Sequence, residues 1–177
     1  MSWTPKFEGV DYERRDKFLL SYLKQRPSKD DPAYPVYKDV LAFIAGSVCM
    51  RDEYRYVSEG AKAQLAKYNI SHPSYKDKYA GKDAYKGLRT EHTIPVKVIV
   101  EYLESLSEEE LTADTLKDFA EKVSGLALIT EEEDKELNNA GVRDCLPNGT
   151  TLADILSGKT EHSIRYKNVI TVTPEPK

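Results

Sequence analysis

Apolar residues in this 177-residue sequence occur only in short segments, which proline, glycine or clustered polar residues separate from one another. In most of these segments the apolar residues recur every three or four positions, the spacing of one face of an α-helix. This spacing predicts helices over 12–23, 36–50, 53–68 and 96–106, and 36–50 is apolar enough to be a buried helix. Such a chain is expected to fold mainly into short helices around a shared core.

Two further helices are predicted from capping residues. Thr112 or Asp114 can cap a helix that runs to about Val123, because a short polar side chain satisfies unpaired N–H groups of the first turn. A turn at Pro147-Asn148-Gly149 then precedes a short helix over 151–156.

A strand followed directly by a helix is predicted between 126 and 139. The run 126–129 is short and wholly apolar, which is typical of a buried strand. Thr130 and Glu133 then match a capping box, in which each side chain satisfies the other residue's N–H. Gly141 favours an end to this helix near Asn139.

The remaining segments carry weaker signals. Residues 69–87 lack an apolar period and are expected to form a loop or short irregular turns. Apolar and polar residues alternate over 164–172, which predicts a strand, and 173–177 is expected to be a flexible tail. We therefore expect one domain over 1–177 of the α+β class, mainly helical, with short strands near 126–129 and 164–172.

Membrane, secretory and cysteine-based classes find no support in the sequence. The longest apolar run, 40–45, is far shorter than the roughly 20 residues that cross a bilayer. The N-terminus shows no basic region followed by an apolar one, so we expect a cytoplasmic protein. Cys49 and Cys145 have no CxxC companion and are expected to be buried thiols. The sequence also lacks the glycine-rich patterns of nucleotide binding, so no nucleotide or organic cofactor is indicated.

Charge is distributed unevenly along the chain. Residues 1–90 carry a net charge of +5 and residues 91–177 carry −9, within a total of −4. Such an asymmetry can steer association with a charged partner, although an acidic solvated surface would produce it equally well.

One short motif contains residues that are suited to catalysis: Glu91-His92-Thr93-Ile94-Pro95. It resembles the opening of the HNH, or ββα-metal, nuclease motif. The resemblance implies that Glu91 binds a divalent metal such as Mg²⁺ and that His92 is the general base for water. A neutral imidazole can accept a proton near neutral pH, and a metal stabilises charge that develops on a phosphate.

The run from Gly125 to Asp134 resembles the second half of the same motif. On that alignment Asp134 is the second metal ligand, and a carboxylate suits Mg²⁺. Gly125 stands where the family has an asparagine that positions the catalytic histidine, and the gap from His92 is long. The match is therefore compatible both with an active nuclease and with an inactive relative. The same residues also have an ordinary structural interpretation, with Glu91 and His92 at a helix start and Asp134 on a solvated face.

The segment before the motif interleaves basic and aromatic residues. Basic side chains contact phosphates and aromatic rings stack on unpaired bases, so this segment is a candidate nucleic-acid surface, although a solvated loop would look similar. Its candidate residues are Lys76, Lys78, Lys82, Lys86, Arg89, Tyr79 and Tyr85.

Two hypotheses follow. The first is an HNH-like protein that acts on DNA or RNA, either as a metal-dependent nuclease or as a degenerate relative. The second is a non-catalytic interaction protein of the immunity, antitoxin or phage-encoded inhibitor type, whose acidic half binds a basic protein partner. Its candidate acidic residues are Glu104, Glu108–Glu110, Asp114, Asp118 and Glu131–Glu136.

Overall fold

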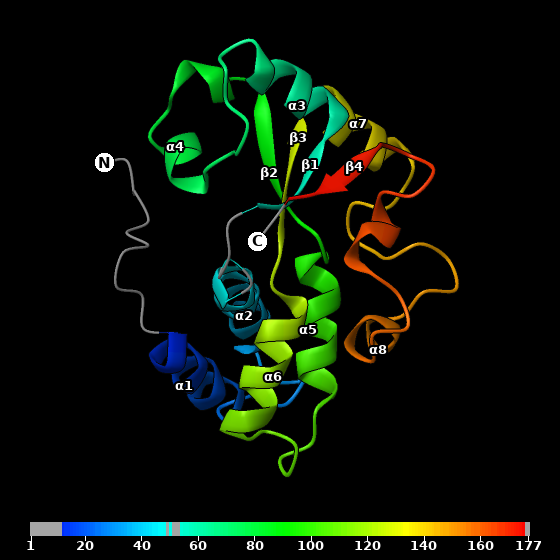
Figure 1. The fold of residues 1–177 in the computed structure, drawn as a ribbon. Coiled ribbons are helices and arrows are strands. Elements are labelled where there is room, and N and C mark those ends of the chain that lie inside the picture. Colours follow the sequence, from blue (N-terminus) through cyan, green and yellow to red (C-terminus); the bar gives the residue numbers. More distant parts are fainter. Residues whose placement is uncertain (1–11, 49, 51–53, 176–177) are drawn as a thin grey trace.

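The computed structural model of the chain describes residues 12–48, 50 and 54–175. Helices gather in one part of the molecule and a small sheet with its covering helices forms the other (Figure 1). The helical part comprises α1 (Tyr12–Leu23), α2 (Tyr34–Val48), α5 (Val96–Ser105), α6 (Ala113–Val123) and α8 (Leu152–Leu156). One apolar core, with contributions from all five helices, holds this part together.

The sheet has four strands in the order β2-β3-β1-β4. Their bounds are β1 (Tyr54–Ser58), β2 (Leu88–His92), β3 (Leu126–Thr130) and β4 (Val172–Pro174). β1 runs parallel to β3, whereas β2 pairs with β3 and β4 pairs with β1 in the antiparallel sense. β3 lies inside the sheet, and its burial on both faces explains its continuous apolar run.

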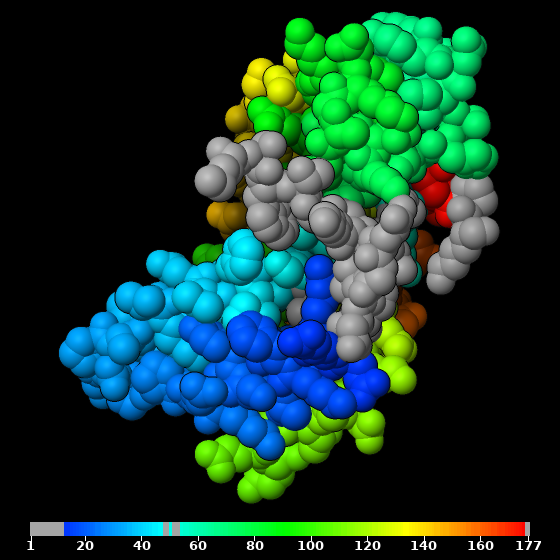
Figure 2. All heavy atoms as spheres, turned by 90° about the vertical axis from the view of Figure 1, so that its left-hand side faces the viewer, coloured from blue at the N-terminus to red at the C-terminus, as the bar shows by residue number. Residues whose placement is uncertain are grey.

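Helical segments cover both faces of the sheet. The apolar cluster on one face includes residues of α3 (Glu59–Ala66), α4 (Tyr75–Tyr79) and the short 3₁₀ helix η1 (Asp83–Tyr85). The cluster on the other face includes Leu137 of α7 (Glu131–Asn139) and Tyr166, which follows the 3₁₀ helix η2 (His162–Arg165). Seen from the side, α3 and α4 lie above α1 and α2 (Figure 2).

The predicted α+β class with a mainly helical content is confirmed. The predicted strand at 126–129 is β3, and the predicted capping box of Thr130 and Glu133 opens α7. Thr112, rather than Asp114, caps α6. Residues 69–87 contain only short helical turns, as expected. Within the described residues, no helix combines the length and the apolar character needed to cross a membrane.

The helix predicted over 53–68 is wrong in its first third. Residues 54–58 form β1, in which Tyr54, Tyr56 and Val57 are buried, and Ser58 then caps α3. Aromatic and β-branched residues favour strands, and pairing with β3, about 70 residues away in the sequence, outweighs the local helical spacing.

The strand predicted over 164–172 is misplaced. Residues 162–165 form η2, and β4 begins only at Val172. A turn lies between them, with Asn168 at a φ of 67°. Tyr166, Val169 and Ile170 pack onto one sheet face from that turn. The prediction of a flexible tail is also wrong for residues 173–175. β4 includes Thr173 and Pro174, and the Glu175 N–H donates to the Arg55 carbonyl. Residues 176–177 lie outside the described residues.

Two predictions about burial also need correction. α2 is buried on only one side, because the side chains of Val36 and Phe43 are 66% and 69% exposed. Cys145 is exposed, on the loop after α7, where its thiol donates to the Gly141 carbonyl. Cys49 lies outside the described residues.

Candidate nucleic-acid interface

The predicted motif lies on β2, β3 and α7, which form one continuous unit. β2 and β3 are antiparallel and in register from Leu88↔Thr130 to His92↔Leu126. α7 begins at the residue after β3, so Asp134 falls in its first turns. Glu91 and His92 therefore belong to the last two positions of a strand, and not to the helix start that their ordinary structural interpretation assumes.

Glu91 is held by a buried arginine. The Arg165 Nη2 donates to Glu91 Oε2 at 3.2 Å, and the side chains are 1% and 24% exposed, respectively. The same guanidinium donates to the backbone carbonyls of Val142 (2.9 Å), Arg143 (2.9 Å) and His92 (2.5 Å). Four acceptors thus surround one cation, which makes the ion pair part of the folded core.

Burial and neighbouring charges together set the pKa of Glu91. Burial raises the pKa of Glu91 above its usual range, and the cation of Arg165 offsets this only in part. The negative charge of Asp134 raises the pKa of Glu91 further, and Arg143 lowers it. The Glu91 carboxylate and the Arg165 guanidinium therefore lie together on the sheet face that α7 covers.

His92 points away from this cluster. It pairs with Leu126 of β3 whereas Glu91 pairs with Ala127, and successive side chains of a strand lie on opposite faces. The His92 Nε2 donates to the Gly46 carbonyl of α2 at 3.1 Å. Burial lowers the pKa of His92, so its imidazole is neutral at pH 7.

The donor set of this site fits a guanidinium better than a divalent metal. Mg²⁺ prefers about six oxygen ligands in a regular geometry, and the Glu91 carboxylate already pairs with the Arg165 guanidinium. Within the described parts of the chain, no three or more His, Cys, Asp or Glu side chains are grouped so that they could hold a metal ion.

Gly125, which stands in place of the family's asparagine, lies beside a different histidine. A Cβ at Gly125 would be 2.8 Å from Thr93 Oγ1 and 3.3 Å from His162 Nδ1, so there is no space for a side chain. His162 is 3% exposed, its Nε2 donates to the Lys122 carbonyl (2.8 Å), and its Nδ1 accepts from the Thr93 hydroxyl (2.7 Å). Burial and the Arg55 cation lower the pKa of His162 to about 4.

The basic segment borders the same unit, because Arg89 belongs to β2. Arg89 pairs with Glu131 at the start of α7 (3.1 Å), and Lys82 pairs with Asp77 (2.8 Å). Burial and the Arg89 charge lower the pKa of Lys78, and the Glu131 charge offsets part of this effect. Lys76, Lys82 and Lys86 are exposed.

The two tyrosines of the segment differ. Tyr79 is 44% exposed, whereas Tyr85 is 1% exposed and accepts a hydrogen bond from the Ser74 N–H. Tyr85 is therefore a core residue and has no ring face to offer a ligand.

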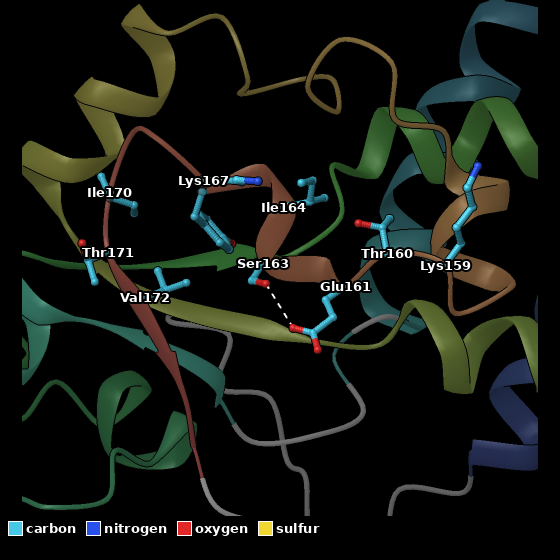
Figure 3. Close-up of a pocket in the computed structure, with 10 residues that line it drawn as sticks. Lys159, Thr160, Glu161, Ser163, Ile164, Lys167, Ile170, Thr171 and Val172 are labelled. Carbon is cyan, nitrogen blue, oxygen red and sulfur yellow. Dashed lines mark hydrogen bonds between the residues drawn. The ribbon is translucent and has the colours of Figure 1, made fainter.

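Sequence reasoning included neither Arg165 nor His162 among the candidate site residues. No spacing signal marks either one, because each contacts segments about 20 to 110 residues away in the sequence. A hollow of about 520 Å³ beside η2 and the start of β4 was also unforeseen (Figure 3). Its lining includes Lys159, Lys167 and Ile170 but none of the predicted site residues.

No protein-family model matches this sequence, and no curated protein or solved structure is significantly similar to it.

Proposed function

We propose that this chain is an HNH-like protein that binds nucleic acid without cleaving it, with Arg165 in the place of the metal ion. The observation that carries the proposal is the buried Arg165 guanidinium on the Glu91 carboxylate. A fixed positive charge there neutralises the carboxylate that the resemblance assigns to the metal. It cannot supply the open coordination positions through which a metal polarises a phosphate or activates water.

The order of the elements supports the HNH-like part of the proposal. Two antiparallel strands, β2 and β3, are followed by α7, and helices α5 and α6 occupy the long connection between the strands. Glu91 lies on the sheet face that α7 covers, and Asp134 lies on α7 itself.

The position of the basic segment supports the nucleic-acid part. Arg89 lies two residues before Glu91 on β2, and Lys76, Lys82 and Lys86 of the same segment are exposed. Cations gathered beside the motif can bind phosphates whether or not any cleavage follows.

The first experiment combines cleavage, metal-binding and nucleic-acid-binding assays on the full chain. We expect no cleavage of single- or double-stranded DNA or of RNA with Mg²⁺ or Mn²⁺, and no heat of binding when Mn²⁺ is titrated by calorimetry. We expect nucleic-acid binding that weakens as salt rises and that EDTA leaves unchanged.

The matched control for this experiment compares His92→Ala with His72→Ala, because His72 is 73% exposed and lies outside the motif. Cleavage that needs a metal, persists in His72→Ala and disappears in His92→Ala would overturn the proposal in favour of an active nuclease.

The second candidate function is binding of a basic protein partner through the acidic half. Fewer acidic side chains of α7 are available to a partner than the sequence suggests. Glu131 pairs with Arg89 and Glu133 accepts hydrogen bonds from the backbone, whereas Glu132 and Glu136 are exposed. A chain that binds no nucleic acid in the assay above would direct attention to this surface.

A further inference from the structure

The exposed ring of Tyr79 packs at a tilt against a group of aromatic rings that reaches the sheet. Its centroid lies 4.3 Å from that of Tyr75, which is 4% exposed. The Tyr75 ring in turn packs edge-on against Tyr54 of β1, at 6.0 Å between centroids. Tyr79 therefore stands at the end of a short helix with its ring supported from behind. A supported ring loses little conformational freedom when a ligand stacks on it.

Cations lie beside this ring. Lys78 precedes it in α4, and Lys76 and Lys82 of the same segment are exposed. Burial and, to a smaller extent, the Arg89 charge lower the pKa of Lys78, so a bound phosphate would favour its charged form. Lys82 lies 2.8 Å from Asp77, which balances part of the positive charge of the segment.

A ring face with adjacent cations suits an unpaired base and its phosphates. In a duplex the base faces are stacked on each other and only the edges are accessible, so a single protruding ring gains nothing from them. In a single strand each base offers a free face, and stacking on an aromatic side chain contributes about 1–3 kcal/mol per base.

We infer that this surface binds single-stranded nucleic acid, with a base on Tyr79 and a phosphate at Lys78. The inference rests on the proposed function, which requires only that nucleic acid binds at the basic segment. It adds that this surface prefers a single strand to a duplex, and that the Tyr79 ring causes this preference.

The test measures fluorescence anisotropy of a labelled 12-nucleotide oligo(dT) and of a labelled DNA duplex of 12 base pairs, at two salt concentrations. We expect the native chain to bind oligo(dT) more tightly than the duplex. Tyr79→Leu should weaken oligo(dT) binding about 5- to 150-fold, the range that one stacked base contributes, and should leave duplex binding unchanged.

Two further variants complete the test. Tyr68→Leu removes another exposed ring (52%) outside the basic segment and should change neither affinity. Lys78→Gln should weaken both complexes and reduce the salt dependence by about one phosphate contact. Circular dichroism of each variant confirms that it remains folded.

The outcomes separate the inference from the proposed function. Equal or tighter duplex binding, or oligo(dT) binding that Tyr79→Leu does not weaken, overturns the inference and leaves the proposed function standing. Binding to neither nucleic acid overturns both.

Discussion

The space around a helical glycine decides whether a larger residue fits there, as two glycines of this protein show. A Cβ added at Gly46 of α2 would lie 3.6 Å from Val96 Cγ2 and 3.8 Å from His92 Nε2, which is ordinary van der Waals contact. A Cβ added at Gly60 of α3 would lie 2.9 Å from both Glu133 Oε1 and Thr130 Cγ2. α3 and α7 therefore begin so close together that only glycine fits between them.

The two alanine substitutions should change stability in opposite directions. Gly46→Ala should raise the free energy of unfolding by about 0.5–1 kcal/mol, because alanine is the better helix former and finds space. Gly60→Ala should lower it by about 1–2 kcal/mol, because the methyl group displaces the Glu133 carboxylate from its hydrogen bonds. Urea denaturation measures both, and a change of the same sign in the two variants would contradict the geometry.

At the scale of elements, Glu133 joins the starts of two helices. Its Oε2 accepts from the Thr130 N–H (2.8 Å) and from the Ser58 hydroxyl (2.5 Å), and its Oε1 accepts from the Gly60 N–H (3.3 Å). Thr130 caps α7 and Ser58 caps α3. The capping box that the sequence predicts for one helix thus also holds the other helix in place.

Loss of this carboxylate should cost more than loss of an ordinary helix cap. We expect Glu133→Ala to lower the free energy of unfolding by about 2 kcal/mol, since the buried Ser58 hydroxyl also loses its acceptor. Glu132→Ala, in the same turn but exposed, should change it by less than about 0.5 kcal/mol. Thermal unfolding of the pair provides the measurement, and equal effects would show that Glu133 acts only as a surface charge.

At the scale of the whole molecule, His162 joins the helical part to the sheet. Its two ring nitrogens bond to Thr93, which connects β2 to α5, and to Lys122, at the end of α6 before β3. The Arg55 guanidinium of β1 lies 3.3 Å from its Nε2. Protonation of this buried ring would place a second cation beside Arg55, and the Thr93 hydroxyl would then donate to the Gly125 carbonyl (3.1 Å) instead of to Nδ1.

Stability should therefore depend on pH through His162. Its pKa is about 4 in the folded protein, below the ordinary 6.5, so the unfolded chain binds more protons between these values. The stabilising contribution is complete above about pH 6.5 and is lost as the pH falls toward 4, by up to about 3 kcal/mol. His92, whose pKa is also lowered, contributes with the same sign.

The variant His162→Gln tests this dependence, because glutamine keeps polar atoms at the site but does not titrate. Urea denaturation at pH 4.5, 5.5 and 7 should show a smaller loss of stability in acid for His162→Gln than for the native chain. An unchanged pH profile would show that His162 is not the responsible group.

The sequence by itself determined those features whose energetics lie within about four residues. The caps at Thr112 and Thr130, the end of α7 near Gly141 and the apolar strand between Gly125 and Thr130 depend on neighbouring residues, so local patterns predict them. It also indicated Glu91, His92, Asp134 and the basic segment as one candidate region.

Only the tertiary structure decided the features that depend on distant partners. Residues 54–58 became a strand because β3 and β4 pair with them, and Tyr85 became a core residue because α4 folds over it. Arg165 reaches Glu91 across 74 residues of sequence, and His162 reaches Thr93 across 69. These contacts join residues that are distant in the sequence, so no local preference predicts them. Burial in the folded interior makes an unpaired charge or hydrogen-bonding group costly, and this cost favours the contacts.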